Sequence, residues 1–269
     1  MNFYDLPFTK FEQGGTGTVE DPYLIATTGD FQQMALEPTK NYKMVADIDM
    51  SKAAQWWTPV KNFTGSLDGD GHTIYNLGIK TTEGHAGLFG SLDLNGVAKN
   101  LNFVNPTVDV TNTNQYVGVL AGETSYSTDS KAKGINVDNI SVYGAKIAGE
   151  DAMISAAGGL VGCANLYTNI TNSSFQGEIA LPNSENVGGI VGQTRTSSGV
   201  SACYANVNAA AKSNLGGIVG VAGSVQDFCV FSNCEVRGKL TAENSVGGFI
   251  GDNYFNNISN VISLSLIHI

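Results

Sequence analysis

The stretch Gly188-Gly189-Ile190-Val191-Gly192 decides the fold, because close copies of it recur along the 269-residue chain. In each copy a glycine stands at the second position, two bulky apolar residues follow, and a glycine or alanine ends the motif. The second-position glycines are Gly87, Gly118, Gly159, Gly189, Gly217 and Gly248. They are 31, 41, 30, 28 and 31 residues apart, and six copies with a period near 30 predict a repeat architecture.

Each copy of the motif is followed by two further short segments that contain apolar residues, separated by turns rich in Gly, Asn and Ser. After Gly162 these segments are residues 171–175 and 178–181. Three short strands in about 30 residues fit one coil of a parallel β-helix, whereas a propeller blade needs about 40 residues and four strands. We therefore predict an all-β fold, a right-handed parallel β-helix of about six to seven coils. Asparagines are expected at its corners, because they tolerate left-handed backbone conformations.

The glycines of the motif exclude large side chains from the strand that we expect the motif to form. Leu160 and Val161, like the bulky pair of every other copy, are neighbours on this strand. Neighbouring strand residues point to opposite faces, so both faces are expected to carry a ladder of aliphatic side chains. One ladder would fill the interior, and the other would be covered by a loop or would form an outward apolar stripe.

The two ends of the chain differ from the repeats. Residues 21–25 are expected to form a strand, and Asp30 is expected to cap a helix over residues 31–37. This helix would cover the open end of the β-helix, whose strands would otherwise lack partners. We divide the chain into an N-terminal cap with the initial coils (1–80), the repeats (81–263) and a tail (264–269). The tail resembles the translation of a sequencing-library adapter, so we expect a non-native end and a metagenomic fragment of a longer reading frame.

Charge and hydropathy exclude two classes of partner. The formal net charge is −10, with 14 basic and 24 acidic residues, so the clustered cations that a nucleic-acid surface needs are missing. No run of 18 apolar residues exists, and we expect no insertion into a membrane.

Residues 1–13 lack a signal-peptide pattern, so either the protein is not exported or its true start lies upstream. The four cysteines show no CxxC spacing and are expected to be small buried apolar side chains.

At this point the sequence resembles a known family. The repeated motif is similar to the GLUG motif of secreted and surface proteins of gut bacteria, as are residues 15–25 and 63–74. The resemblance runs from about residue 15 to 262, although Val119 and Ala121 depart from the pattern in the second copy. It implies a β-helical segment of an extracellular, adhesin-like cell-surface protein. Related repeats also accompany immunoglobulin-A-specific metallopeptidases as non-catalytic regions.

Candidate catalytic and metal-binding residues are few. Asp68-Gly69-Asp70-Gly71-His72 is expected to form a glycine-rich turn rather than a calcium loop, because the fifth and twelfth positions lack oxygen ligands. Asp47 and Asp49 could place two carboxylates on one strand face, as in a glycoside hydrolase, but solvated turn acids are the commoner interpretation. No HExxH, GxSxG or P-loop pattern occurs, and we predict no catalytic residue, no metal and no cofactor.

Ligand-binding candidates are the aromatic residues Trp56, Trp57 and Tyr126, the last of which lies in a polar insertion over residues 123–133. The alternative for the tryptophans is packing over the first coil. We predict a non-catalytic, extracellular or surface-anchored β-helix that acts in adhesion or as a spacer, with a glycan or a host or bacterial surface protein as partner. Two alternatives stay open: a polysaccharide lyase or glycoside hydrolase that uses Asp47, Asp49 or Glu123, and the non-catalytic region of a larger surface peptidase.

Overall fold

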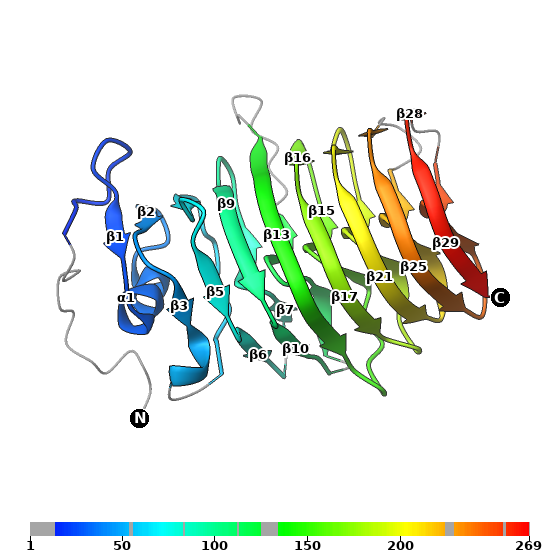
Figure 1. Cartoon of the computed structure of the whole chain (residues 1–269), viewed down its shortest axis with the longest axis horizontal. Coiled ribbons are helices and arrows are strands. Elements are labelled where there is room, and N and C mark those ends of the chain that lie inside the picture. The colour runs from blue at the N-terminus through cyan, green and yellow to red at the C-terminus, as the bar shows by residue number, and fades with distance from the viewer. Residues whose placement is uncertain are drawn as a thin grey trace.

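A computed structural model describes residues 14–53, 56–82, 84–111, 113–124, 134–223, 229–254 and 257–268. The chain is 56% strand and 5% helix and forms a β-solenoid of about six turns (Figure 1). Every strand pair recorded among the described residues is parallel. The predicted all-β solenoid with one short N-terminal helix is confirmed.

The described residues form three parallel sheets along the solenoid, with 17, six and six strands, and we call them sheets 1, 2 and 3. Sheet 1 has 17 strands: β1 (Tyr23–Ile25), β2 (Asn41–Met44), β3 (Ile48–Asp49), β4 (Ser66–Asp68), β5 (Thr73–Tyr75), β6 (Gly78–Lys80), β9 (Val97–Val104), β10 (Thr107–Asp109), β13 (Ile135–Ala148), β16 (Thr168–Thr171), β17 (Ser174–Ala180), β20 (Gly199–Ser201), β21 (Tyr204–Ala211), β24 (Val230–Ser232), β25 (Glu235–Ala242), β28 (Asn257–Ser259) and β29 (Ile262–His268). Sheet 2 has six: β7 (Gly84–Ala86), β11 (Asn114–Val117), β14 (Ala156–Gly158), β18 (Glu185–Gly188), β22 (Ser213–Gly216) and β26 (Val246–Gly247). Sheet 3 has six: β8 (Phe89–Leu92), β12 (Ala121–Thr124), β15 (Val161–Ala164), β19 (Val191–Thr194), β23 (Val219–Ala222) and β27 (Ile250–Asn253).

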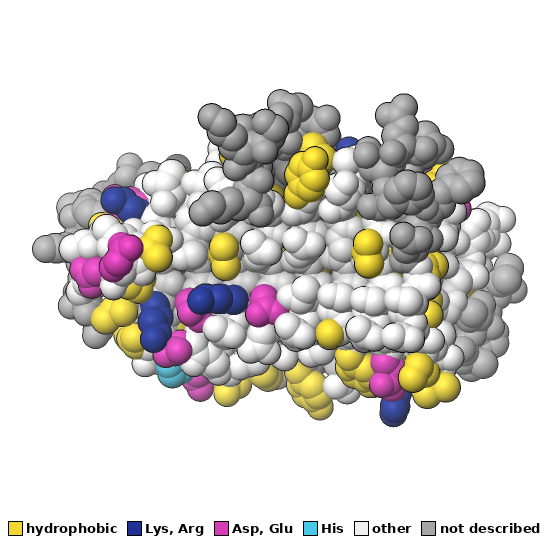
Figure 2. Space-filling model, turned by 90° about the horizontal axis from the view of Figure 1, so that it is seen from above, with side chains coloured by type: hydrophobic (Ala, Val, Ile, Leu, Met, Phe, Trp, Pro, Cys, Tyr) yellow, Lys and Arg dark blue, Asp and Glu magenta, His cyan; other side chains and the backbone are white. Residues whose placement is uncertain are grey.

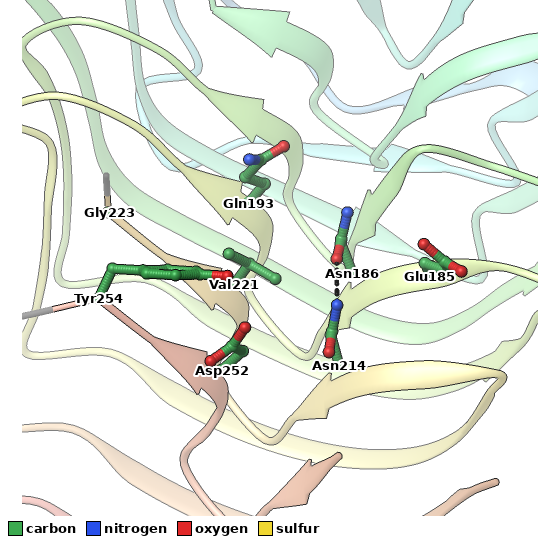
Figure 3. Close-up of a pocket in the computed structure, with 8 residues that line it drawn as sticks. All are labelled: Glu185, Asn186, Gln193, Asn214, Val221, Gly223, Asp252 and Tyr254. Carbon is green, nitrogen blue, oxygen red and sulfur yellow. Dashed lines mark hydrogen bonds between the residues drawn. The ribbon is translucent and has the colours of Figure 1, made fainter. Parts of the chain in front are cut away.

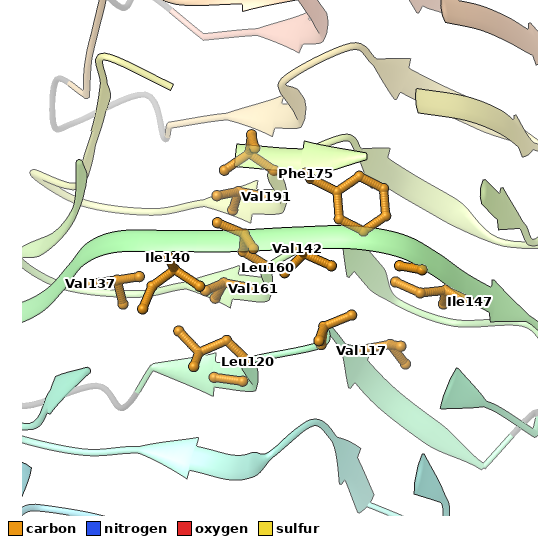
Figure 4. Packing of buried hydrophobic residues seen from close by; sticks show 14 of the residues in the cluster. Val117, Leu120, Val137, Ile140, Val142, Ile147, Leu160, Val161, Phe175 and Val191 are labelled. Carbon is orange, nitrogen blue, oxygen red and sulfur yellow. The ribbon is translucent and has the colours of Figure 1, made fainter. Parts of the chain in front are cut away.

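The GLUG-like motif forms a bend and not the single strand that we predicted. β14 ends at Gly158, β15 begins at Val161, and Gly159 and Leu160 make the bend between sheets 2 and 3. Leu160 and Val161 are both 0% exposed. The prediction of ladders on opposite faces is therefore wrong, because the change of chain direction breaks the strand alternation. Both bulky residues lie in the core, which Figure 4 shows beside the long strand β13.

The register of sheet 2 corrects the alignment of the first two motif copies. Ala86 pairs with Val117, and Val117 pairs with Ala157. The glycines that follow these residues therefore occupy one structural position: Gly87, Gly118 and Gly158. In sheet 2 the sequence alignment, which matched the first two with Gly159, is therefore off by one residue. In sheet 3 Phe89 and Val161 both pair with Ala121, so the first copy keeps its predicted alignment there.

The register of sheet 3 removes the irregularity of the second copy. Ala121 pairs with Val161, so Gly122 takes the place of Gly162 at the end of the bend. A Cβ on Gly122 would lie 2.9 Å from the backbone oxygen of Tyr116 in sheet 2. Glycine at this position therefore lets sheets 2 and 3 approach backbone to backbone.

Strand β13 shows why the wall of sheet 1 can be long and still turn. Its residues alternate between buried and outward positions, and the alternation slips at Asn139 and Gly144. Both have positive φ, 54° and 69°. In later coils the equivalent stretch of chain forms two separate strands, such as β16 and β17. These strands span residues 168–171 and 174–180, whereas we predicted strands over residues 171–175 and 178–181.

Asparagine dominates the left-handed corners, as predicted. Positive φ angles occur at Asn62, Asn76, Asn95, Asn100, Asn105, Asn139, Asn172, Asn186, Asn214, Asn233 and Asn260. On the face shown in Figure 2, most charged side chains lie toward the N-terminal coils. Two ion pairs lie in those coils, Lys43 with Asp70 and Lys99 with Asp68, each at 3.0 Å.

The N-terminal helix begins earlier than predicted. Helix α1 spans Thr28–Gln33 and continues as the 3₁₀ turn η2 (Met34–Leu36); a second 3₁₀ turn, η3, spans Met50–Lys52. The N-cap of α1 is Thr27, and Asp30 is the third helical residue. The Asp30 carboxylate accepts the Thr27 backbone N–H at 3.0 Å. The helix covers the N-terminal end of the solenoid, with Phe31 in the core (Figure 1).

Among the described residues, no helix has the length and apolar character needed to cross a membrane.

All four cysteines are buried: Cys163, Cys203, Cys229 and Cys234. This confirms the interpretation that they serve as small buried side chains. Burial raises the pKa of the Cys163 thiol to about 12. A thiol with so high a pKa stays protonated near neutral pH and is a poor nucleophile.

Candidate binding face

Two exposed tyrosines stand in one row on the outward side of sheet 1. Tyr75 pairs with Val104, and Val104 pairs with Tyr143, which is 58% exposed. Two strand spacings separate the two tyrosines, about 10 Å. The parallel register thus presents two aromatic side chains in one outward row of sheet 1, with Val104 between them.

A third exposed aromatic side chain, Trp56, lies past the left-handed corner at Asn76 that separates β5 from β6. Trp57 bridges to Ile79, which places Trp56 in the row of Gly78, and its side chain is 52% exposed. A Cβ on Gly78 would lie 2.8 Å from the Trp56 ring, so the absence of a side chain there lets the ring lie against the backbone. The Lys80 ammonium is 5.9 Å from the ring centroid. An exposed tryptophan held in this way is a preformed stacking platform.

An ion pair borders the tryptophan. The Lys80 ammonium lies 3.0 Å from the Asp109 carboxylate, and the two residues are neighbours in the register of β6 and β10. We call Trp56, Tyr75 and Tyr143, together with this pair, the aromatic face. It offers ring surfaces next to charged hydrogen-bonding groups, the combination that recognises the apolar faces and hydroxyls of sugars.

Trp57 serves the fold instead. Its side chain is 5% exposed, its indole N–H donates to the Leu88 carbonyl at 2.8 Å, and its ring centroid is 5.1 Å from that of Phe31. The structure therefore separates the two tryptophans, one for packing over the first coil and one for the surface. Tyr126 lies outside the described residues.

Asp47 precedes strand β3 and Asp49 ends it, and both carboxylates accept hydrogen bonds from the next coil. Asp47 accepts the Thr73 backbone N–H at 2.9 Å and lies 3.1 Å from His72 Nδ1, and the backbone hydrogen bond lowers the pKa of Asp47. Asp49 accepts from the Asn76 amide at 2.9 Å, which lowers its pKa. Carboxyl groups with lowered pKa values are poor general acids, since that role needs a raised pKa.

The stretch from Asp68 to His72 forms a tight turn. Asp68 accepts the Asp70 backbone N–H at 3.0 Å, and Asp70 and Gly71 both have positive φ. Burial raises the pKa of Asp68, but its hydrogen bonds and the Lys99 ammonium outweigh this and lower it. No group of three or more His, Cys, Asp or Glu side chains suited to a metal is found in the part of the chain that the structure describes.

Glu123 belongs to a cluster between sheets 2 and 3 that sequence reasoning missed. Its carboxylate lies 3.2 Å from His85 Nε2, and the His85 ring stacks on Tyr116 at 5.0 Å between centroids. Arg195 donates to the Tyr116 hydroxyl at 3.3 Å, and the Asn165 amide donates to Glu123 at 3.3 Å. These residues come from different coils, so no local spacing in the sequence could have indicated their contact.

Comparisons with known proteins find the GLUG motif in one stretch of the chain. Residues 154–180 match the family model of the GLUG motif, which confirms the resemblance. The chain is 36% identical over 178 residues to halomucin of Haloquadratum walsbyi, an alignment of 60% of this chain and 2% of halomucin. It is 31% identical over 140 residues to a proposed Gly-rich membrane protein of Evansella cellulosilytica, covering 48% of this chain and 15% of the relative. The chain thus spans a small part of both curated relatives.

Two solved structures share the fold. A proposed immunoglobulin A1 protease from Bacteroides ovatus superimposes with a TM-score of 0.70 and 22% identity, over 96% of this chain and 80% of that one. An IgA1 protease structure gives a TM-score of 0.63 and 17% identity, over 90% of this chain and 19% of that one. At these identities the similarity establishes the β-solenoid and leaves activity open.

Proposed function

We propose that this GLUG-motif β-helix is a non-catalytic module of an extracellular surface protein, and that it binds a glycan on its aromatic face. The observation that carries the proposal is the row of Tyr75 and Tyr143 beside the exposed Trp56. Aromatic rings about 10 Å apart along a straight sheet suit alternate rings of an extended polysaccharide. A rigid solenoid keeps this spacing fixed, so little entropy is lost when the ligand binds.

The relatives support the location that we propose. The name of halomucin refers to a mucin, and the second relative is named a Gly-rich membrane protein. The overall negative charge disfavours binding to nucleic acid, as argued above. A surface module with few charged residues, 14% of the chain, would meet a neutral or weakly charged polymer.

The positions of the acids favour binding over hydrolysis. In sheet 3, Glu123 and Asp252 stand in one row, four strand steps apart, or about 19 Å. The paired carboxyls of glycoside hydrolases are about 5–9.5 Å apart. Asp47 and Asp49 lie in the region of sheet 1 and accept hydrogen bonds from Thr73 and Asn76 of the next coil. We therefore propose that the module holds its ligand without cleaving it.

A glycan and matrix-protein array followed by calorimetry tests the proposal. We expect polysaccharide binding that Trp56→Ala and Tyr143→Ala each weaken by about tenfold or more, because each removes one of the exposed rings of the contact. Tyr167→Ala is the matched control, since Tyr167 is exposed at a corner away from the aromatic face.

Three outcomes would contradict the proposal. Unchanged affinity in both aromatic-face variants would show that the aromatic face is not the binding site. Capture of matrix proteins alone would show that the ligand is not a glycan. Release of new reducing ends from any bound polysaccharide would show that the module is an enzyme.

A further inference from the structure

A pocket of about 440 Å³ lies between sheets 2 and 3 in the C-terminal half of the solenoid. Sheet 2 contributes Glu185, Asn186 and Asn214, and sheet 3 with the segment after it contributes Gln193, Asp252 and Tyr254 (Figure 3). Its volume falls within the range of small-molecule sites, about 300–1,000 Å³. The pocket is separate from the aromatic face, which lies on sheet 1.

The amides of the pocket are fixed in place before any ligand arrives. Asn186 donates to the Ser155 carbonyl at 2.7 Å, and Asn214 donates to the Asn186 side-chain oxygen at 2.8 Å. Both asparagines have a φ of 53°, the corner conformation of the solenoid. The Gln193 amide has no hydrogen-bond partner among the described residues, so it can both donate to a ligand and accept from it.

Tyr254 and Asp252 complete the chemistry of the pocket. Tyr254 is 40% exposed, and its backbone N–H donates to the Ala222 carbonyl at 3.1 Å, which holds the ring at the pocket. The Asp252 carboxylate lines the pocket together with Tyr254 and raises the pKa of that tyrosine. An aromatic ring next to a carboxylate and planar amides is suited to a sugar, whose CH face stacks while its hydroxyls donate and accept.

The charge of the lining selects among sugars. Glu185 and Asp252 are acidic, and no lysine, arginine or histidine lines the described pocket. A carboxylated or sulfated sugar would meet two like charges there, which disfavours binding. We propose that this pocket is a second ligand site that binds a neutral saccharide of one or two rings, with Tyr254 as the stacking surface and Asp252, Asn214 and Gln193 as the groups that bind its hydroxyls.

Saturation-transfer NMR and titration with D-glucose, D-galactose, D-mannose and their β-linked disaccharides test the site. We expect at least one of these probes to bind, and N-acetylneuraminic acid and D-glucuronic acid to bind much more weakly. Tyr254→Leu removes the ring, and Asp252→Asn keeps the shape of the side chain while removing its charge. Each variant should lower the affinity for the bound probe by about tenfold.

The matched control is Tyr143→Leu, which removes an exposed tyrosine from the aromatic face only. Probe binding that survives Tyr143→Leu but falls in Tyr254→Leu supports the pocket, whatever becomes of the aromatic face. If Tyr143→Leu abolishes probe binding while Tyr254→Leu and Asp252→Asn bind as the parent protein does, the pocket is not the binding site. The proposal for the aromatic face would be unaffected by that result. No binding of any neutral probe, or equal binding of the acidic sugars, would also overturn it. Circular dichroism and the unfolding midpoint of each variant identify any loss caused by misfolding.

Discussion

Single glycines determine how closely successive coils stack. A Cβ on Gly159 would overlap the backbone oxygen of Gly189 in the next coil, and a Cβ on Gly189 would overlap that of Gly217. At the bend between sheets 2 and 3 the coils therefore touch through backbone alone. A glycine is needed there for close approach rather than for an unusual φ, since neither Gly159 nor Gly189 has a positive φ.

Gly189→Ala should destabilise the protein by about 1–3 kcal/mol, because the added methyl group has no space and the backbone of two coils must separate. Gly199→Ala is the control. Its Cβ would lie 3.4 Å from the Val230 oxygen, an ordinary contact, so its effect should be small and either neutral or slightly stabilising. Urea unfolding followed by circular dichroism compares the two variants, and equal midpoints would contradict the backbone-contact explanation.

A row of left-handed corner residues runs along sheet 1, and Ala202 interrupts it. In this row Asn139 donates to Asn100 at 3.0 Å, and Asn260 donates to Asn233 at 3.2 Å. Ala202 has a φ of 52°, a conformation that costs an L-residue about 1–2 kcal/mol and that asparagine adopts more readily. The alanine thus carries the strain of the corner without the side-chain hydrogen bonds of the row.

Ala202→Asn should therefore stabilise the protein by about 1 kcal/mol, since asparagine suits the corner and its amide can join the row. Ala210→Asn introduces the same side chain within the regular strand β21 and should bring no gain. Differential scanning calorimetry measures both midpoints. A midpoint for Ala202→Asn at or below that of the parent protein would show that the row contributes nothing at this position.

At the scale of elements, α1 depends on its first turn. Thr27 Oγ1 accepts the Asp30 backbone N–H at 3.1 Å, and the Asp30 carboxylate accepts the backbone N–H groups of Ala26 and Thr27. A helix of six residues has little stability of its own, so this capping box and the packing of Phe31 hold it on the end of the solenoid.

Thr27→Ala should cost about 1 kcal/mol, the usual loss when an N-cap oxygen is removed. Thr27→Ser keeps that oxygen and should remain within a few tenths of a kcal/mol of the parent protein. Chemical unfolding followed by tryptophan fluorescence is a suitable measurement, because Trp57 lies against Phe31 of this helix. Equal losses in both variants would point to the Thr27 methyl group and not to the cap.

The elements also show how far a single sequence could be interpreted. The period, the strand-rich coil and the asparagine corners were predictable, because glycine and asparagine encode backbone conformations locally. The bend was not, since Leu160 and Val161 have the apolar pattern of a strand and only the position of Gly159 against the next coil forces the turn. The alignment of Gly118 failed for a related reason: its register is fixed by pairing with another coil.

The whole molecule buries its cysteines along the solenoid, and this gives a probe of its cooperativity. Coils of a repeat protein interact only with their neighbours and can open in parts. Burial raises the pKa of Cys163 to about 12, and thiolate is the reactive form, so the folded coil protects Cys163 in two ways.

We expect the native protein to react slowly with a thiol reagent at pH 8, and each cysteine to react as its own coil opens in urea. Mass spectrometry of labelled peptides assigns the order of opening, and a chemically unfolded sample is the control for full reactivity. Labelling of Cys163 in the native protein at the rate of the unfolded chain would contradict its burial.

The sequence by itself determined the repeat, the all-β coil and the chemistry of the corners, because period and local backbone preference are properties of neighbouring residues. Only the tertiary structure decided that Trp56 is exposed while Trp57 is buried, that Glu123 meets His85, and that a pocket forms beside Tyr254. The physical reason is the stacking of coils: it brings residues about 30 positions apart to one strand spacing, about 4.8 Å, and a shift of one residue in that register changes every contact across it.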